Sequence, residues 1–151
     1  MEDTPMNFSM SREKCQEFLT GLHVGVLSVA ADGRGPLTMP VWYAYELGGD
    51  LWLVTDKDSR KAKLIRRAGR FSLCVQDEAP PYKYVSVEGP VVAITPVDDE
   101  RHVRSMARRY LGIKHGDQYT EDILKAPDRR EEVAIYMQPE RWSSADYSQS
   151  S

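Results

Sequence analysis

The chain has 151 residues, of which 41% are hydrophobic and 28% are charged, and its formal net charge is −3. These values are typical of one soluble globular domain and not of a disordered chain or an array of domains. No apolar run reaches the roughly 20 residues that a membrane-spanning helix needs, and the net acidity argues against general nucleic-acid binding.

Two further features indicate the compartment. The first residues, MEDTPMNFSMSREK, lack the charged-then-apolar pattern of a secretion signal. The two cysteines, Cys15 and Cys74, are far apart and form no CxxC pair. We therefore expect a reduced protein of the cytoplasm, with neither a membrane nor nucleic acid as its partner.

The first part of the chain predicts one helix and three strands. Ser11 is a suitable helix cap, and the apolar residues after it fall on one face of a helix that Gly21 helps to end. Runs of β-branched and apolar residues predict strands at 23–30, 36–46 and 51–55. The turn sequence LGGD should join the last two of these strands as a hairpin.

The rest of the chain, after the basic segment at 57–70, predicts three more strands and two more helices. The strands are expected at 70–76, 84–95 and 132–138, and Gly89-Pro90 should break or bulge the second of them. A helix should run from about residue 95 to Gly112, and a shorter helix should cover 120–126.

Six to seven strands with few helices predict a mainly β fold, in which a largely antiparallel sheet closes into a barrel and the helices lie outside it. A parallel doubly wound fold would need more helices, and neither GxGxxG nor GxxxxGK[ST] occurs in the sequence. We treat residues 1–151 as a single domain, with fraying expected over 1–10 and 143–151.

The segment from Lys57 to Arg70 concentrates positive charge in an acidic protein. It holds seven cations and one acid, so its local balance is 7 − 1 = +6. The cations are Lys57, Arg60, Lys61, Lys63, Arg66, Arg67 and Arg70. Such a segment is compatible with a solvated helix face, a nucleic-acid footprint or a site for one anionic ligand.

Ser59 is a natural N-cap for a helix over residues 60–68, and the free N–H groups at that helix start attract an anion. Cations in a first turn oppose the helix dipole, so stability alone does not explain Arg60 and Lys61. Lys61 also shares its helix face with Leu64 and Ile65. This placement predicts a phosphate site, or else a lysine whose stem covers its apolar neighbours.

The stretch from Leu22 to Val75, LHVGVL…RFSLCV, resembles the flavin/deazaflavin split-barrel superfamily, the fold of pyridoxamine 5′-phosphate oxidase. The resemblance rests on a strand that ends in Thr and leads into a Ser-Arg-Lys helix, and it covers residues 15–142. The following stretch, APPYKYVSVEGPV, is similar to the subgroup described as probable F-420-dependent enzymes. A split β-barrel is the fold that this resemblance implies.

The resemblance also implies which residues hold a cofactor. Arg60 and Lys61, with Ser59 at the cap, match the residues that bind the cofactor phosphate. The other matched or candidate positions are Val54 and Thr55 beside the ribityl-ring region, Pro40, Val41 and Trp42 along the ring, Lys57 near the phosphate or the F-420 tail, and Tyr84 and Trp142. Ordinary strand packing is the alternative for residues 40–42, solvent exposure for Lys57, and core or interface packing for Tyr84.

The implied function is that of an oxidoreductase that binds the deazaflavin coenzyme F-420 and transfers hydride to an activated double bond of a small molecule. The alternatives are an FMN-binding reductase or oxidase, and a non-catalytic flavin, deazaflavin or haem carrier. A true pyridoxamine phosphate oxidase is not expected, because the C-terminus lacks the Arg-Leu-x-Pro ending of that enzyme.

The residues identify no catalytic side chain and no metal site. The three histidines lack metal-ligand spacing, and the proton for a reduced carbon is expected from solvent or a tyrosine such as Tyr84. The resemblance implies a homodimer in which the partner closes each cofactor site. Trp142 and the loop at 78–84 are the expected crossing contacts, because large side chains in polar sequence are enriched at interfaces.

Overall fold

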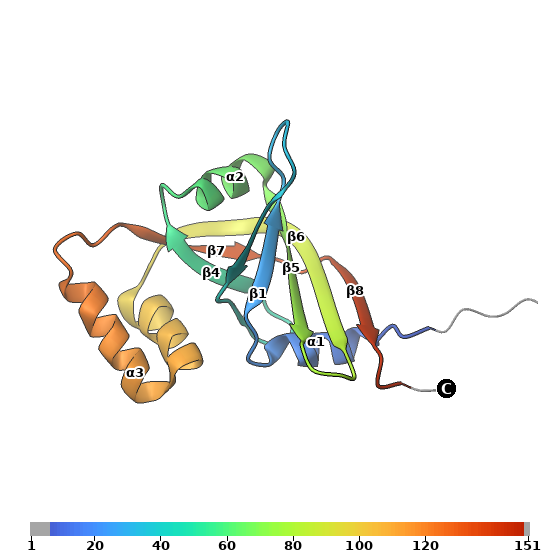
Figure 1. Cartoon of the computed structure of the whole chain (residues 1–151). Helices are drawn as coiled ribbons and strands as arrows, with labels where there is room; N and C mark the ends of the chain where they lie inside the picture. The colour runs from blue at the N-terminus through green and yellow to red at the C-terminus, as the bar shows by residue number, and fades with distance from the viewer. Residues whose placement is uncertain (1–6, 150–151) are drawn as a thin grey trace, which may run out of the picture.

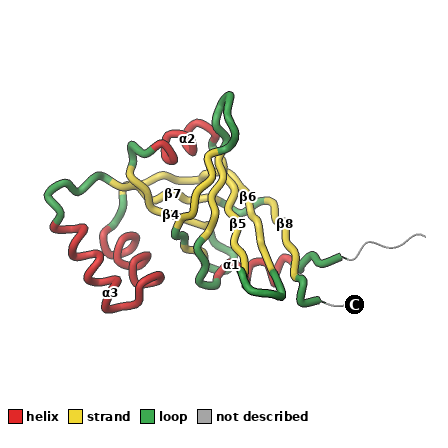
Figure 2. The backbone as a smooth tube through the Cα atoms, viewed as in Figure 1, coloured by secondary structure: helices red, strands yellow, loops and turns green. Residues whose placement is uncertain are grey.

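The computed structural model describes residues 7–149, and expectations for residues 1–6 and 150–151 lie outside that range. Within it, eight strands are accompanied by three helices and one π-helical segment (Figures 1 and 2). In chain order they are α1 (Arg12–Thr20), β1 (Gly25–Val29), β2 (Leu37–Val41), β3 (Ala44–Tyr45), β4 (Leu51–Asp56), α2 (Arg60–Ala68), β5 (Arg70–Asp77), β6 (Lys83–Pro96), η1 (Asp99–Arg104), α3 (Ser105–Lys125), β7 (Glu132–Met137) and β8 (Arg141–Asp146).

All strand pairs are antiparallel, and the strand order is β2-β1-β5-β6-β7-β4-β3 with β8 on the free side of β6. The predicted hairpin around LGGD is confirmed, since Tyr45 lies opposite Leu51. The predicted strand at 36–46 is interrupted at Trp42 and Tyr43 and forms β2 and β3. This interruption turns Trp42 away from the sheet ladder.

The long strand β6 divides the sheet into the two halves of a split barrel. Residues up to Pro90 pair with β5, and residues from Val91 onward pair with β7. The change of partner coincides with Gly89, where an added Cβ would lie 1.8 Å from the Gln138 carbonyl oxygen, so only glycine fits. A bulge follows between Val91 and Ala93, which places the predicted break correctly to within a few residues.

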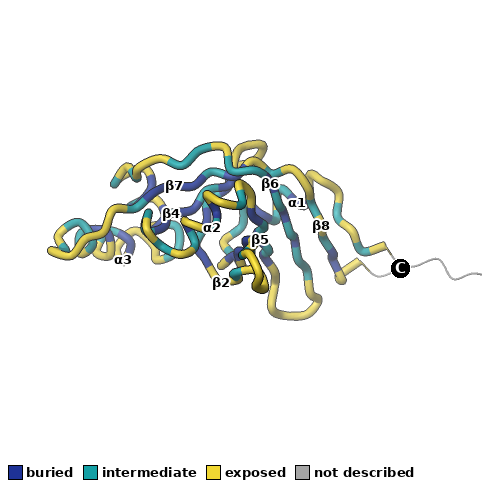
Figure 3. Tube along the Cα trace, turned by 90° about the horizontal axis from the view of Figure 1, so that it is seen from above, coloured by how far each residue is buried: buried dark blue, intermediate teal, exposed yellow. Residues whose placement is uncertain are grey.

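The barrel interior is filled by alternate residues of the strands, and Figure 3 shows buried positions along β4 and β7. In β4 the inward residues Leu51 and Leu53 are fully buried, whereas Trp52 and Val54 face outward. Helices α1 and α2 close opposite ends of the barrel with Leu19 and Ile65 (Figure 1). Each such fully buried side chain contributes about 1.5–3 kcal/mol of hydrophobic stabilisation.

The predicted start of the third helix is wrong, because β6 continues through Pro96 and η1 begins at Asp99. The predicted stop at Gly112 corresponds to a real break, since this residue has φ 83° and ψ 169° inside α3. The chain reverses there, and residues 113–125 run back beside the first half of α3 (Figure 2). The shorter predicted helix at 120–126 is the end of this second half.

The expected fraying from residue 143 is wrong for residues 143–146. They belong to β8, whose register places Ser143 opposite Ser86 and Asp146 opposite Lys83 on β6. The N-terminal segment is also held there, because the Asp146 N–H donates to the Phe8 carbonyl and the Met10 N–H donates to Ser144 Oγ. The sequence did not predict β8. Its first four residues alternate between exposed and half-buried positions, as in an edge strand, so they carry no clear hydrophobic pattern.

Candidate cofactor site

A pocket of about 240 Å³ lies between the outer face of the barrel and the two halves of α3. The barrel contributes the end of β2, the outward-facing Val54 of β4 and the start of β7, while α2 contributes Lys61. The lining residues are Pro40, Val41, Trp42, Val54, Lys61, Val103, Met106, Ala107, Tyr119, Ile123 and Glu132. Five of them belong to the cofactor-binding positions expected from the sequence.

The start of α2 is built by hydrogen bonds that its sequence predicts. Ser59 Oγ accepts from the Ala62 N–H at 3.0 Å, which confirms Ser59 as the N-cap. Thr55 at the end of β4 lies 3.1 Å from the same hydroxyl, so the last buried residue of the strand orients the cap. The helix ends at Gly69 in the left-handed conformation, with φ 73°.

Lys61 lies half-buried at the pocket wall, and burial alone lowers the pKa of its ammonium group. No acid of residues 7–149 forms an ion pair with it, whereas Lys63 on the same helix is exposed. A desolvated ammonium without a partner is unfavourable in an empty pocket. Lys61 is therefore suited to accept an anionic group from a ligand.

Most other cations of the basic segment are already engaged. Lys57 pairs with Glu131 at 2.6 Å, and Arg70 bridges Glu140 at 3.1 Å and Glu88 at 3.4 Å. The remaining engaged cations are Arg67, which pairs with Asp32, and Arg66, which donates to the Lys57 carbonyl at 2.7 Å. This pairing explains how the fold tolerates a segment of balance +6. Arg60 and Lys63 are exposed, so Lys61 differs from the other cations by being half-buried without an acidic partner among residues 7–149.

Aromatic side chains form one wall of the pocket. The Trp42 indole stacks on the Tyr110 ring with centroids 4.9 Å apart and 4° between the planes. Tyr119, from the second half of α3, approaches the same indole at 5.8 Å with a tilt of 53°. Trp42 therefore sits between the barrel and both halves of α3, which fixes a flat apolar surface.

The first half of α3 is tied to the barrel by polar contacts with backbone carbonyls. Tyr110 Oη donates to the His23 carbonyl at 2.6 Å and accepts from the Tyr43 N–H at 3.1 Å. Arg109 donates to the Tyr43 carbonyl at 3.0 Å and to the Gly21 carbonyl at 2.7 Å. These bonds satisfy the backbone groups where the strand at Trp42 is interrupted.

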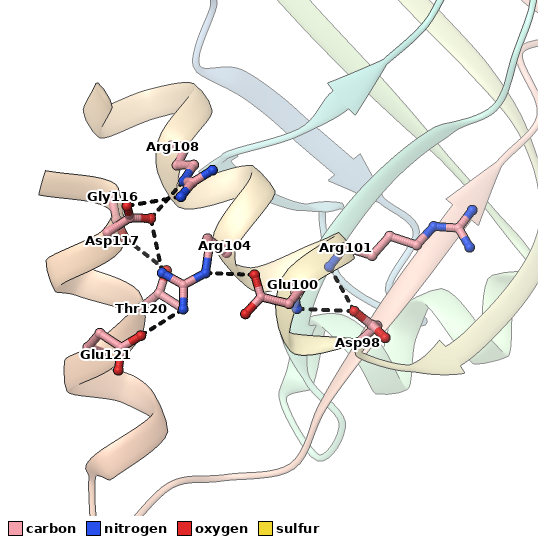
Figure 4. A network of polar contacts seen from close by, with 9 residues as sticks. All are labelled: Asp98, Glu100, Arg101, Arg104, Arg108, Gly116, Asp117, Thr120 and Glu121. Atoms are coloured by element: carbon pink, nitrogen blue, oxygen red, sulfur yellow. Dashed lines mark hydrogen bonds and ion pairs between the residues drawn. The ribbon is translucent and has the colours of Figure 1, made fainter. Parts of the chain in front are cut away.

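The second half of α3 is held to the first by a network of charged groups (Figure 4). Arg104 donates to Glu100 at 2.8 Å, to Asp117 at 3.0 Å and to Glu121 at 2.7 Å. Arg108 also donates to Asp117, at 2.6 Å, and the two guanidinium groups lower the pKa of Asp117 to about 2. The network fixes the helical hairpin that carries Tyr119 and Ile123 into the pocket.

Glu132 and Tyr119 are pocket residues that the sequence did not indicate. Glu132 is the first residue of β7, and burial raises the pKa of its carboxyl group, with Asp56 and Asp99 adding to the effect. Burial and the charge of Glu132 raise the pKa of the Tyr119 phenol. No local pattern reveals either residue, because the return of α3 at Gly112 brings Tyr119 to the pocket.

Six of the expected site residues do not line this pocket. Thr55 and Ser59 form the hydrogen-bonded start of α2, and the other four lie elsewhere. Lys57 and Arg60 lie on the loop and first turn before Lys61, with Lys57 held by Glu131. Tyr84 stands between Gln76 and Ala145 in the middle of the sheet, so it cannot donate a proton within this pocket. Trp142 packs at 6.4 Å against the ring of Tyr45, under the guanidinium of Arg12.

Within residues 7–149, no group of three His, Cys, Asp or Glu side chains is arranged to hold a metal ion. None of the helices described is both long enough and apolar enough to cross a membrane.

The sequence model of the family described as pyridoxamine 5′-phosphate oxidase matches residues 11–145. None of the curated protein sequences compared with the chain is significantly similar to it.

Solved structures share the fold. A conserved hypothetical protein from Mycobacterium tuberculosis is 23% identical with a TM-score of 0.73, over 97% of this chain and 91% of that one. An F420 reductase is 22% identical with a TM-score of 0.69, over 85% and 94% of the two chains. An FAD-binding protein from Mesorhizobium loti is 25% identical with a TM-score of 0.59, over 90% and 94%.

The chain belongs to the pyridoxamine 5′-phosphate oxidase family, and its fold is that of the flavin- and deazaflavin-binding split barrels. The family and the fold expected from the Ser-Arg-Lys helix are therefore confirmed.

Proposed function

We propose that the chain is an oxidoreductase that binds coenzyme F-420 in the pocket beside Lys61 and transfers hydride to an activated double bond of a small molecule. The observation that carries this proposal is the isolation of Lys61. It is a half-buried ammonium group without an acidic partner among residues 7–149, next to the start of a helix and an apolar pocket.

The residues present fit a cofactor with a planar ring and a phosphate. Pro40 and Trp42 offer flat apolar surface, and Lys61 offers the charge-assisted hydrogen bond that a phosphate requires. The N–H groups at the start of α2 add the positive end of a helix dipole. Thr55 and Ser59 hold this start in place through their shared hydrogen bond.

When bound, a reduced deazaflavin or flavin supplies the hydride itself. The chain has to orient the ring and exclude water from it. Met106, Ala107 and Ile123 of α3 line the side of the pocket opposite the barrel, so we assign the exclusion of water to α3. The pocket volume of about 240 Å³ is below the range of about 300–1,000 Å³ that is usual for ligand pockets. Surface from a second copy would enlarge the site, in line with the homodimer proposed from the family resemblance.

FMN is the second candidate, and a non-catalytic carrier is the third. The similarity to an F420 reductase supports F-420, whereas the similarity to an FAD-binding protein supports a flavin.

The test is a titration of the purified, ligand-free protein with F-420 and with FMN, followed by fluorescence. We expect F-420 to bind at least tenfold more tightly than FMN. Tighter binding of FMN by the same factor would assign the site to a flavin. Mass spectrometry of any ligand that accompanies the protein during purification gives an independent identification.

A further inference from the structure

Glu132 places a second unpaired charge in the pocket that contains Lys61. It lies at the start of β7, opposite Asp56 in the β4 register, and its half-buried side chain lines the pocket. No cation of residues 7–149 lies within ion-pair distance of its carboxylate. Two desolvated groups of opposite sign thus share one small cavity without pairing with each other.

The groups around Glu132 do not neutralise it. Arg129, in the loop before β7, is held by Asp99 of η1 at 2.5 Å. Asp56 of β4 adds negative charge nearby and is paired with Arg130 at 3.3 Å. The remaining titratable groups that face the cavity are Tyr119 of α3 and Lys61 of α2. Burial and the two acids outweigh Arg129 and raise the pKa of Glu132.

An anionic ligand stabilises the charged form of Lys61 and destabilises the charged form of Glu132. A phosphate at Lys61 favours the ammonium form of the lysine, but it also brings negative charge close to Glu132. Because Glu132 and Lys61 line the same pocket, repulsion by an ionised Glu132 should weaken the anion's binding on the order of tenfold. A neutral Glu132 removes this penalty.

We propose that Glu132 is a charge-selecting residue of the pocket, which takes up one proton from solvent when an anionic group binds at Lys61. The carboxylate oxygen of Glu132 gains the proton, and no other bond is made or broken. For F-420 or FMN this inference rests on the proposed function. For a simple anion such as inorganic phosphate it stands on the geometry of the pocket alone.

The experiment compares the wild-type protein with Glu132→Gln and with Glu131→Gln. Glu131 is the matched control, because it is the adjacent carboxylate but is exposed and paired with Lys57 outside this pocket. F-420 affinity is measured from about pH 6 to about pH 8, and calorimetry in two buffers of different ionisation enthalpy counts the protons taken up. NMR follows the Glu132 carboxyl with and without inorganic phosphate.

We expect Glu132→Gln to bind F-420 about tenfold more tightly than wild type at the upper pH, with a smaller pH dependence and no proton uptake. Glu131→Gln should keep the wild-type pH dependence. Weaker binding by Glu132→Gln, or unchanged binding with the wild-type pH dependence, would overturn the inference.

If neither F-420 nor FMN binds, the proposed function fails, and the NMR titration then decides the inference by itself. An increase in the apparent pKa of Glu132 with phosphate, which is lost in Lys61→Ala, supports it. An unchanged titration in wild type refutes it.

Discussion

Trp42 and Tyr110 stack face to face, with ring centroids 4.9 Å apart and 4° between the ring planes, although they lie far apart in the chain. Trp42 stands where β2 gives way to β3, and Tyr110 stands near the break in α3. The stack is therefore the contact through which α3 positions a wall of the pocket.

Replacement of Tyr110 should separate its two roles. Tyr110→Phe retains the ring but loses the hydrogen bonds to His23 and Tyr43, so we expect a loss of about 1 kcal/mol of stability. Tyr110→Ala also removes the stack, and we expect a loss of about 2–4 kcal/mol together with weaker cofactor binding. Denaturant unfolding and Trp fluorescence measure both. Wild-type cofactor affinity in Tyr110→Ala would show that α3 does not shape the pocket.

The charged network around Asp117 should stabilise the helical hairpin in a pH-dependent way. The pKa of Asp117 is lowered from 3.8 to about 2 by Arg108 and Arg104. A lowered pKa means that the stabilisation is present above 3.8 and is lost as the pH falls toward 2. Asp117→Asn should therefore melt at a lower temperature than wild type at neutral pH, and the difference should narrow below about pH 4.

Asp122→Asn is the control for this prediction. Asp122 lies on the same half of α3, but its side chain accepts only from Gln118 and contacts no arginine. Its replacement should leave the melting temperature close to that of wild type at every pH. Equal melting temperatures for Asp117→Asn and wild type at neutral pH would show that the network does not hold the hairpin.

Glu132 should have the opposite effect on stability. Its pKa is raised by burial, so the folded protein binds more protons than the unfolded chain in the range above the ordinary value of 4.5. Stability therefore falls as the pH rises through this range. Glu132→Gln should melt at a higher temperature than wild type at neutral pH and at a similar temperature near pH 4.

Glu131→Gln supplies a comparison of opposite sign. The salt bridge with Lys57 lowers the pKa of Glu131, so its contribution is present at neutral pH and disappears on acidification. Its loss should lower the melting temperature slightly, because the pair is exposed. If both glutamine variants shift the melting temperature in the same direction, the assignment for Glu132 is wrong.

A homodimer is the fourth prediction. Alternate residues Leu22, Val24 and Val26 are 61%, 55% and 38% exposed, and Val26 lies opposite Pro40 at the edge of the pocket. Burial of this apolar row against a second copy would complete the small pocket. We expect a dimer by light scattering and a shift toward monomer in Val24→Glu, with weaker cofactor binding.

The matched control is Val92→Glu, at an exposed valine of β6 that does not line the pocket. It should remain dimeric with wild-type affinity. A wild-type monomer that binds the cofactor tightly would contradict the prediction. The separate expectation that Trp142 and the loop at 78–84 cross to the partner is tested by cross-linking at the exposed Tyr82.

The sequence was informative where local chemistry decides structure. The predicted range 60–68, which starts after the Ser59 cap, matches α2 to the residue, because helix ends depend on nearby hydrogen bonds and backbone angles. The sequence was a poor guide where contacts between distant segments determine the structure. Strand β8 has an exposed, polar pattern and forms because β6 leaves one side free for pairing.

The same distinction applies to the candidate site. Lys61 was predictable, since its helical position relative to Leu64 and Ile65 directs it inward. Tyr119 was not, because its approach depends on the reversal at Gly112 and on the Arg104–Asp117 contact. Glu132 was not, because the pairing of β7 with β4 brings it there. Tyr84 was an expected site residue because its ring could stack on a cofactor or its hydroxyl donate a proton, but the register of β6 places it in the middle of the sheet.

The final prediction concerns two lysines that stand two positions apart on α2. Lys61 lines the pocket, whereas Lys63 is exposed and points about 200° further round the helix. Lys61→Ala should weaken binding of the phosphate-bearing cofactor by roughly 10- to 150-fold, the value of a partly desolvated, charge-assisted hydrogen bond of about 1.5–3 kcal/mol. Lys63→Ala removes the same charge but acts through water and salt, so it should cost well under about 1 kcal/mol.

Fluorescence titration of both variants at two salt concentrations distinguishes a specific site from a basic surface. A specific contact at Lys61 should remain the larger effect in high salt, because solvent ions screen a half-buried group less than an exposed one. The small effect of Lys63→Ala should disappear under the same conditions. Equal losses that diminish together would indicate that α2 attracts anions only through its summed charge, and the phosphate would then have to bind away from the Lys61 wall of the pocket.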